Sequence, residues 1–193
     1  MASCFSGGAA YVDGRYMPLD QATIPIIDRG YRRSDVTYDV ASVWRGQFFR
    51  LDDHIARFRR SMTALRLSPA ETDDDIRFIM QRCVQLSGLR DAYVAIDCLR
   101  GRPVFGMPHD PVRARNYIVA FAQPWIDLIT PEVQARGAHF IVANVRRIPS
   151  DSIDQTVKNF HWGDLTRGLF EALDAGADGC VLLDHAGYVT EGP

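Results

Sequence analysis

Lysine is almost absent from this chain. Of the 22 basic residues, 21 are arginine and a single one, Lys158, is lysine. Arginine stays protonated in essentially any protein site, whereas a buried lysine amine can lose its proton and become a nucleophile. Any covalent chemistry between a side-chain amine and a carbonyl therefore depends on Lys158. Codon usage in a GC-rich genome would also leave few lysines, so the residues around Lys158 must decide between the two explanations.

Several other features are lacking. The four cysteines stand far apart, without CxxC or metal-ligand spacing, which predicts reduced thiols, a cytoplasmic protein and no metal. The sequence lacks a serine–histidine–acid pattern, which argues against the common hydrolases. No apolar run approaches the roughly 20 residues that cross a bilayer, and the first residues lack the basic and apolar parts of a signal peptide. A net charge of −2 argues against nucleic acid as a partner.

The sequence that is present has the composition of a globular protein. Its 193 residues are 47% hydrophobic, which is enough to bury a core. Asp13–Gly14 is typical of a tight hairpin turn. Apolar periodicity predicts strands at 10–12, 16–18, 35–44, 47–50, 93–99, 116–121, 139–143 and 179–183. It predicts helices from a cap at Asp52 or Asp53 to about residue 65, from 72–74 to 87–88, and from about 161 to 175.

The order of these elements predicts an α+β protein with two strand-rich halves. We expect an N-terminal domain at 1–122, an interdomain connection at 123–136, where Pro124 and Pro131 lie, and a second domain at 137–193. Active sites often lie between such halves.

Lys158 follows a turn-rich stretch and precedes the last predicted helix. A lysine placed there can form a Schiff base with an aldehyde, most obviously pyridoxal phosphate. Such a site also needs an acid at the pyridine nitrogen, cations or a helix end at the phosphate, and a base for proton transfer. Lys158 itself can be that base once a substrate has displaced it.

Four stretches resemble one known family. They are Ser34–Trp44, Phe48–Phe58, Thr156–Gly168 and, at the end, Thr190–Pro193. In this order they are similar to the motifs of the fold-type IV pyridoxal-phosphate aminotransferases, especially the (R)-selective amine transaminases. The resemblance implies an N-terminal α/β sandwich and a C-terminal pseudo-barrel, here incomplete. It also implies a homodimer whose active site lies between the two domains.

The resemblance assigns roles to individual residues. Lys158 matches the imine-forming lysine, Glu191 the acid at the pyridine nitrogen, and Arg57 the arginine at the cofactor phosphate. On other grounds Glu191 would be a solvated strand-end residue, and Arg57 one exposed cation of a cluster. The positions that match the substrate pocket are Tyr38, Val40, Tyr93 and Trp162, which would otherwise be assigned to the core. His54 and His161 receive no catalytic role, and we expect them to cap or pack.

The chain departs from the amine-transaminase pattern at several positions. Arg33 stands where a histidine is common, and Tyr93 and Ala95 where phenylalanine and an acid are usual. The loop 100–106 looks more like that of branched-chain relatives. Together Arg33, Arg100 and Arg102 offer a clamp for a substrate carboxylate.

These residues predict a transaminase that moves an amino group between an amine or amino acid and a keto acid such as pyruvate. A branched-chain or D-amino-acid aminotransferase, or an aminodeoxychorismate lyase, is the alternative within the fold. The family's glycine-rich motif continues beyond Thr190, so we expect this chain to be cut short. A binding or dimerising fragment without catalysis is therefore the alternative from another class.

Overall fold

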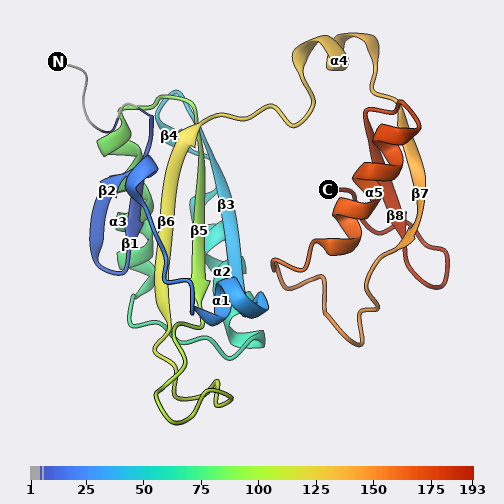
Figure 1. Cartoon of the computed structure of the whole chain (residues 1–193). Helices are drawn as coiled ribbons and strands as arrows, with labels where there is room; N and C mark the ends of the chain where they lie inside the picture. Colours follow the sequence, from blue (N-terminus) through green and yellow to red (C-terminus); the bar gives the residue numbers. More distant parts are fainter. Residues whose placement is uncertain (1–4, 6) are drawn as a thin grey trace. The chain divides into compact units, whose positions relative to one another are not determined.

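The computed structural model describes residue 5 and residues 7–193. The elements of the first part are β1 (Ala9–Val12), β2 (Arg15–Pro18), the 3-10 helix η1 (Leu19–Gln21), α1 (Arg29–Arg33), β3 (Val36–Trp44), β4 (Gln47–Phe48), α2 (Leu51–Ala64), α3 (Asp73–Ser87), β5 (Ala92–Leu99) and β6 (Tyr117–Pro124). They are followed by α4 (Pro131–Arg136), β7 (Phe140–Arg146), α5 (Gly163–Asp174) and β8 (Gly179–Leu183) (Figure 1).

The chain divides into two compact units. Unit 1 comprises Met1–Ile126 together with Thr156–Phe160, and unit 2 comprises Asp127–Gln155 together with His161–Pro193. The short segment that holds Lys158 therefore belongs to the first unit, although its neighbours in sequence on both sides belong to the second. The sequence pattern predicts domains that are continuous in sequence and does not predict this exchange of a segment. The bounds 1–122, 123–136 and 137–193 stay a prediction.

Unit 1 is built on a six-stranded antiparallel sheet in the order β2-β1-β6-β5-β3-β4. Helices α2 and α3 pack on one face of this sheet (Figure 1). Because side chains alternate along a strand, residues 37, 39, 41 and 43 of β3 point toward the helices, and residues 38, 40 and 42 point to the opposite face. The first set is fully buried and the second is half-buried. We call the second side the open face.

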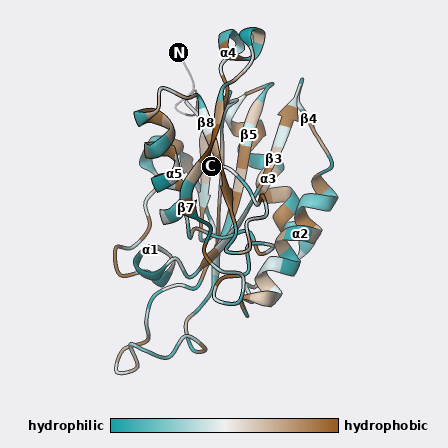
Figure 2. Cartoon of the chain, turned by 90° about the vertical axis from the view of Figure 1, so that its right-hand side faces the viewer, coloured by the Kyte–Doolittle hydropathy of each residue, from teal (hydrophilic) through white to brown (hydrophobic). Residues whose placement is uncertain are grey.

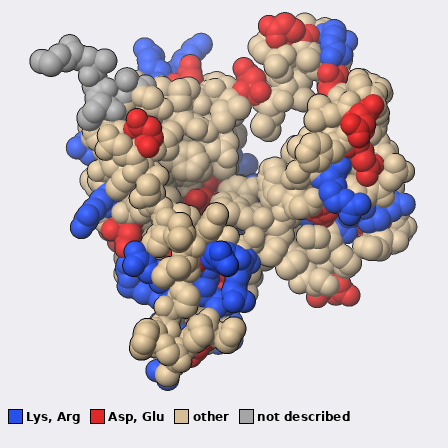
Figure 3. Space-filling model, viewed as in Figure 1, with Lys and Arg blue, Asp and Glu red and all other residues tan. Residues whose placement is uncertain are grey.

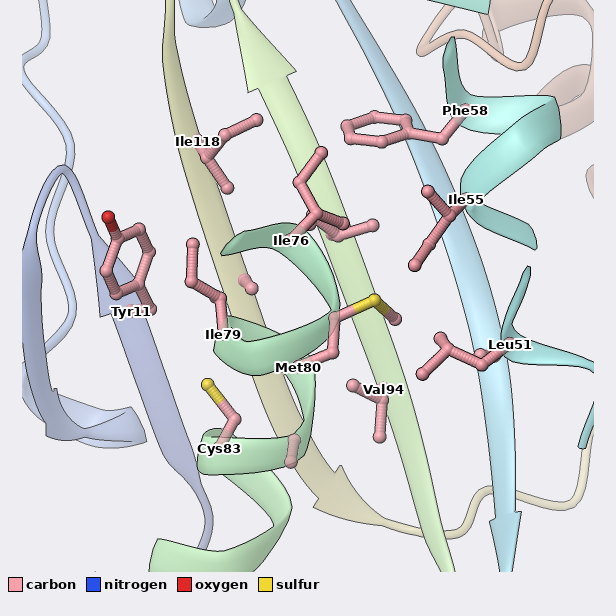
Figure 4. Close-up of a cluster of buried hydrophobic side chains, with 14 of the residues drawn as sticks. Tyr11, Leu51, Ile55, Phe58, Ile76, Ile79, Met80, Cys83, Val94 and Ile118 are labelled. Atoms are coloured by element: carbon pink, nitrogen blue, oxygen red, sulfur yellow. The ribbon is translucent and has the colours of Figure 1, made fainter. Parts of the chain in front are cut away.

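The core of unit 1 lies between the sheet and the two helices (Figure 4). Helix α2 contributes Ile55, Phe58 and Met62, which recur at helical spacing and are almost completely buried. Helix α3 contributes Ile76, Ile79, Met80 and Cys83 in the same way. Periodicity predicts the α2 stripe and, in α3, Ile76, Ile79 and Cys83 together with Leu86, which is only partly buried, but it does not predict Met80. Burial of a side chain of this size stabilises the fold by about 1.5–3 kcal/mol.

The two helices begin differently. Helix α3 starts with a capping box, in which Thr72 and Asp75 each satisfy the other's backbone N–H, and it ends at Gly88 with φ +69°. Helix α2 starts at Arg50, which has φ +51° and makes no side-chain cap. The predicted cap at Asp52 or Asp53 is wrong, because both lie in the first turn, where their charge favours the helix dipole instead.

Unit 2 contains α4 and a two-stranded parallel sheet, β7-β8, with α5 packed on both strands. Its core is small and contains Ala143, Leu165, Ala172, Cys180 and Leu182. Gly168 permits the close packing, since a Cβ there would lie 2.7 Å from Leu182 and 2.9 Å from the Cys180 sulfur. Several large apolar side chains of this unit are exposed, namely Phe140, Val142, Phe170, Leu173, Tyr188 and Val189. Figure 2 colours the residues by hydropathy.

The segment predicted as a connection has structure of its own. β6 continues to Pro124, three residues beyond its predicted end, and α4 occupies Pro131–Arg136. Thr130 caps α4 through Val133, and Pro131 stands at the first helical position, where its missing N–H costs nothing. Within the described part of the chain, no helix has the length and apolarity to cross a membrane.

Candidate active site around Lys158

The segment that carries Lys158 is held along the edge of β3. Asn159 forms an isolated antiparallel bridge with Thr37. The Lys158 carbonyl accepts hydrogen bonds from the Tyr38 N–H at 3.3 Å and from the Thr37 hydroxyl at 2.6 Å. The Lys158 N–H donates to the Ser61 hydroxyl of α2 at 3.4 Å. The main chain of the lysine is therefore fixed on both its polar groups, while its side chain leaves the edge of a rigid sheet.

The Lys158 amine lies directly over an aromatic ring. Its Nζ is 4.3 Å from the centroid of the Tyr38 ring, and the Phe160 ring is tilted against Tyr38 with centroids 4.9 Å apart. Lys158 is half-buried. Of the unit 1 residues assigned to the substrate pocket by resemblance, Tyr38 is the one whose ring the lysine amine contacts.

Val40 and Tyr93 lie further along the same open face. Val40 follows Tyr38 by two positions on β3, and Tyr93 pairs with Ser42 on the neighbouring β5. The Tyr93 ring stacks on Phe121 of β6 at a centroid distance of 6.2 Å. Burial, with smaller contributions from Tyr38 and Asp97, raises the pKa of Tyr93. Both residues are half-buried, so they line a surface beside the lysine rather than the core between sheet and helices.

Arg57 is held in place by Asp39. The Arg57 Nε and Nη2 donate to the two oxygens of Asp39, each at 2.7 Å. His54 Nδ1 lies 2.9 Å from the same carboxylate. Burial acts to raise the pKa of Asp39, but the hydrogen bonds from Arg57 and His54 outweigh it and hold this pKa below its usual range. Asp39 is almost fully buried, whereas Arg57 remains 44% exposed and can still meet an anion.

Sequence reasoning missed Asp39 as part of this site. The alternation of the strand could have identified Asp39, because an acid that points into the core needs a partner for its charge. The packing role expected for His54 takes the form of this contact with Asp39.

Unit 2 contains a second network, centred on Arg147. Its side chain is only 4% exposed and donates to both oxygens of Asp164, at 2.7 and 2.6 Å, and to Glu191 at 2.9 Å. Burial acts to raise the pKa of Asp164, but Arg147 and the N–H groups of Ile148 and Leu165 lower it below the usual range. Glu191, predicted to face the pyridine nitrogen, is thus oriented by a buried guanidinium. Sequence reasoning did not single out Arg147.

The remaining predicted residues occupy exposed positions. Trp162 precedes α5, 42% exposed, and Arg33 ends α1. Arg102 lies in the loop after β5. Figure 3 shows basic side chains gathered near α1. Arg100 is different, because it is buried and donates to Asp35, Leu65 and Arg66. Its expected part in a carboxylate clamp is therefore wrong, since its donors are used within unit 1.

These groups define a chemical repertoire. Unit 1 supplies a primary amine on a sheet edge, aromatic rings beside it and a partly exposed guanidinium. Unit 2 supplies a carboxylate held by a buried arginine. An amine suits an aldehyde, a guanidinium suits a phosphate, and an oriented carboxylate suits a protonated ring nitrogen. Taken unit by unit, these groups therefore have the chemistry that the functional groups of pyridoxal phosphate require.

The chain belongs to the amino-transferase class IV family, whose sequence pattern it matches over residues 37–193. This confirms the fold-type IV resemblance and the predicted fold class. The chain is 26% identical over 183 residues to a protein of Methanocaldococcus jannaschii named "Putative branched-chain-amino-acid aminotransferase", covering 94% of this chain and 62% of that protein. It is 28% identical over 90 residues to a D-alanine aminotransferase of Bacillus licheniformis, covering 47% of this chain and 32% of the other.

Solved structures share the fold. A T.th. branched-chain amino acid aminotransferase with pyridoxamine 5'-phosphate superposes with a TM-score of 0.84 at 22% identity, over 96% of this chain and 62% of that chain. The branched-chain aminotransferase of Thermoproteus uzoniensis with norvaline gives 0.83 at 21% identity, over 95% and 62%. The chain thus spans less than two thirds of the length of these relatives.

Proposed function

We propose that the protein is a pyridoxal-phosphate-dependent transaminase that moves an amino group between an amino acid or amine and a keto acid. The observation that carries this proposal is Lys158, the single lysine, held by its main chain with its amine over Tyr38. When bound, the cofactor supplies an aldehyde and an electron-withdrawing ring.

Each residue has a distinct part in this proposal. Lys158 would hold the cofactor covalently and, once the donor amine has displaced it, its free amine would accept the proton from the donor's Cα. Arg57, kept in position by Asp39, binds the phosphate. Glu191, held by Arg147, keeps the ring nitrogen protonated. Tyr38 and the open face of the sheet bind the substrate and exclude water.

An amino acid is favoured as the donor over an (R)-amine. The relatives with 94% coverage of this chain are named as branched-chain aminotransferases or proteins like them. Arg33 and Arg102, both exposed in unit 1, are available to meet a substrate carboxylate. We further propose a homodimer, to be checked by sedimentation of the native protein.

The test uses the full protein loaded with cofactor. Borohydride reduction should attach the cofactor irreversibly to the peptide that contains Lys158, as read by mass spectrometry. Lys158→Arg keeps the charge but has no reactive amine, so it should lose both the attachment and turnover. Arg60→Lys adds a lysine at an exposed site of α2 and should leave the attachment where it was.

Donor selectivity is tested with leucine, D-alanine and (R)-1-phenylethylamine, each with pyruvate or 2-oxoglutarate. Preference for leucine or D-alanine supports the amino-acid proposal, and preference for the phenylethylamine overturns it. A folded protein that binds no cofactor and turns over none of these donors would instead be a binding or dimerising module. Normal turnover by Lys158→Arg would refute the catalytic role of the lysine.

A further inference from the structure

One acid on the open face has no role in the site as described so far. Asp97 lies on β5, where its Cα pairs with Tyr38 of β3 on one side and with Val119 of β6 on the other. Tyr38 is in turn the residue under the Lys158 amine. Across the sheet the order is therefore Lys158, Tyr38 and Asp97, with adjacent strands about 5 Å apart.

The surroundings of Asp97 are apolar and aromatic. Alternation places Ala95 and Leu99 beside it on β5, and Tyr93 two pleats away on the same face. Among the described residues, the carboxylate has no hydrogen-bond or ion-pair partner. Burial raises its pKa to about 7, which reflects the cost of keeping an unpaired charge in an apolar setting. The residue is nevertheless only half-buried and can meet a ligand.

We infer that Asp97 selects amino donors that carry a second, distal ammonium group, either diamines or basic amino acids. This inference rests on the proposed function, because the reacting amine is placed at Lys158. The second ammonium would then meet a carboxylate on the far side of Tyr38, with the methylenes between lying on apolar side chains. The faces of Tyr38 and Tyr93 also attract cations, which adds to the selection.

The geometry disfavours donors whose distal end is acidic or apolar. A donor whose distal end is a carboxylate would meet Asp97 as a like charge, and an apolar end would leave the carboxylate unpaired. Apart from Asp97, alternation and strand pairing place Arg15, Tyr38, Tyr93 and Tyr117 on this face, and Lys158 lies at its edge. The amine of Lys158 is occupied once cofactor is bound. In the same cross-strand row the cation is Arg15, which lies three strands from Asp97 at about 5 Å per strand, whereas Tyr38 is on the adjacent strand.

Asp97→Asn in the cofactor-loaded full protein tests the inference. The measured quantity is the ratio of kcat/KM for 1,5-diaminopentane to that for 1-aminopentane, and likewise for L-lysine against L-norleucine. We expect each ratio to fall about tenfold or more in the variant, as is typical when a hydrogen bond to a charged group is lost. Asp20→Asn, which removes the same charge from an exposed position of η1, should leave the ratios unchanged. The two pairs separate diamines from basic amino acids.

A binding measurement removes the dependence on turnover. After borohydride reduction the protein is inactive, and calorimetry should find tighter binding of the diamine than of the monoamine, a difference that Asp97→Asn abolishes. Ratios and affinities that do not change in Asp97→Asn overturn the inference. Unchanged ratios in a variant that is less stable than the parent protein would overturn the inference as well, because they would indicate that Asp97 has a partner within the protein. Failure of cofactor attachment at Lys158 would overturn the proposed function instead, so the two failures are distinct.

Discussion

Unit 1 and unit 2 bury their apolar residues to very different extents. In unit 1, six strands and two amphipathic helices enclose a continuous core, and the large side chains Phe58, Ile76 and Met80 are at most 1% exposed. In unit 2, one helix covers two parallel strands, and Phe170, Leu173 and Tyr188 are each more than 60% exposed. Two-stranded sheets are marginally stable by themselves, and parallel sheets are ordinarily covered on both faces.

This difference separates two ways of fixing functional groups. Unit 1 holds Lys158 through main-chain hydrogen bonds to a packed sheet and helix, and it holds Arg57 through an ion pair with the buried Asp39. Unit 2 holds Glu191 through Arg147 and Asp164, a hydrogen-bonded ion cluster beside a small core. We therefore expect the position of Lys158 to depend on packing and that of Glu191 to depend on charge.

The largest effect should come from the core of unit 1. Phe58→Ala should lower its free energy of unfolding by about 3–5 kcal/mol, because it removes a fully buried ring. Leu165→Ala is the matched change in unit 2 and should speed amide exchange in β7 and β8 while leaving β5 and β6 protected. Hydrogen exchange read by mass spectrometry distinguishes the units. Equal loss of protection in both units after Leu165→Ala would mean that they unfold together.

The next effect concerns the ion cluster of unit 2. Arg147→Leu leaves Asp164 buried without its partner, which costs about 3–5 kcal/mol when a buried pair is broken. We expect faster exchange in unit 2 and weaker cofactor binding, since Glu191 loses its orientation. Arg146→Leu, at the exposed neighbouring position, is the control. Unchanged exchange in unit 2 would show that the cluster does not stabilise it.

The smallest effect is a loss of stability in acid. The pKa values of Asp39 and Asp164 are lowered in the folded chain, so both carboxylates stabilise the fold above their unfolded value of about 3.9. That contribution is lost as the pH falls through the lower folded pKa. Denaturant unfolding between pH 5 and 3 (a window set by that value of about 3.9) should show the decline, and Asp39→Asn should flatten it for unit 1. A pH-independent unfolding midpoint would contradict this.

Much of unit 1 could be predicted from its sequence. The alternation in β3 and the stripe Ile55, Phe58 and Met62 indicate a strand and a helix packed on it, because both signals are local. Arg50 at the start of α2 was missed, since a left-handed arginine is fixed by tertiary context rather than by propensity. The short helix α4 was missed because the two prolines suggested a loop, although proline also starts helices.

The site could be predicted only in part. The uniqueness of Lys158 is visible in composition, and its family motif gave Arg57 and Glu191 as companions. The partners Asp39 and Arg147 lie 18 and 44 residues from the side chains they hold. Such pairings depend on the register of strands and on how helices pack, which no local pattern records. Arg100 shows the opposite error. It was predicted to bind a substrate carboxylate, but its guanidinium donates to backbone carbonyls just after α2.

The return of Thr156–Phe160 to the first unit has a consequence for how this protein can be taken apart or recombined. A protease cut between β6 and α4 would leave the halves still joined by strand-like pairing along β3. A chimera that exchanged everything after Ile126 would take Lys158 from one parent, and Thr37 and Ser61, which hold the main chain of Lys158, from the other. The two units therefore cannot be exchanged between proteins as independent modules without separating Lys158 from the residues that hold its main chain.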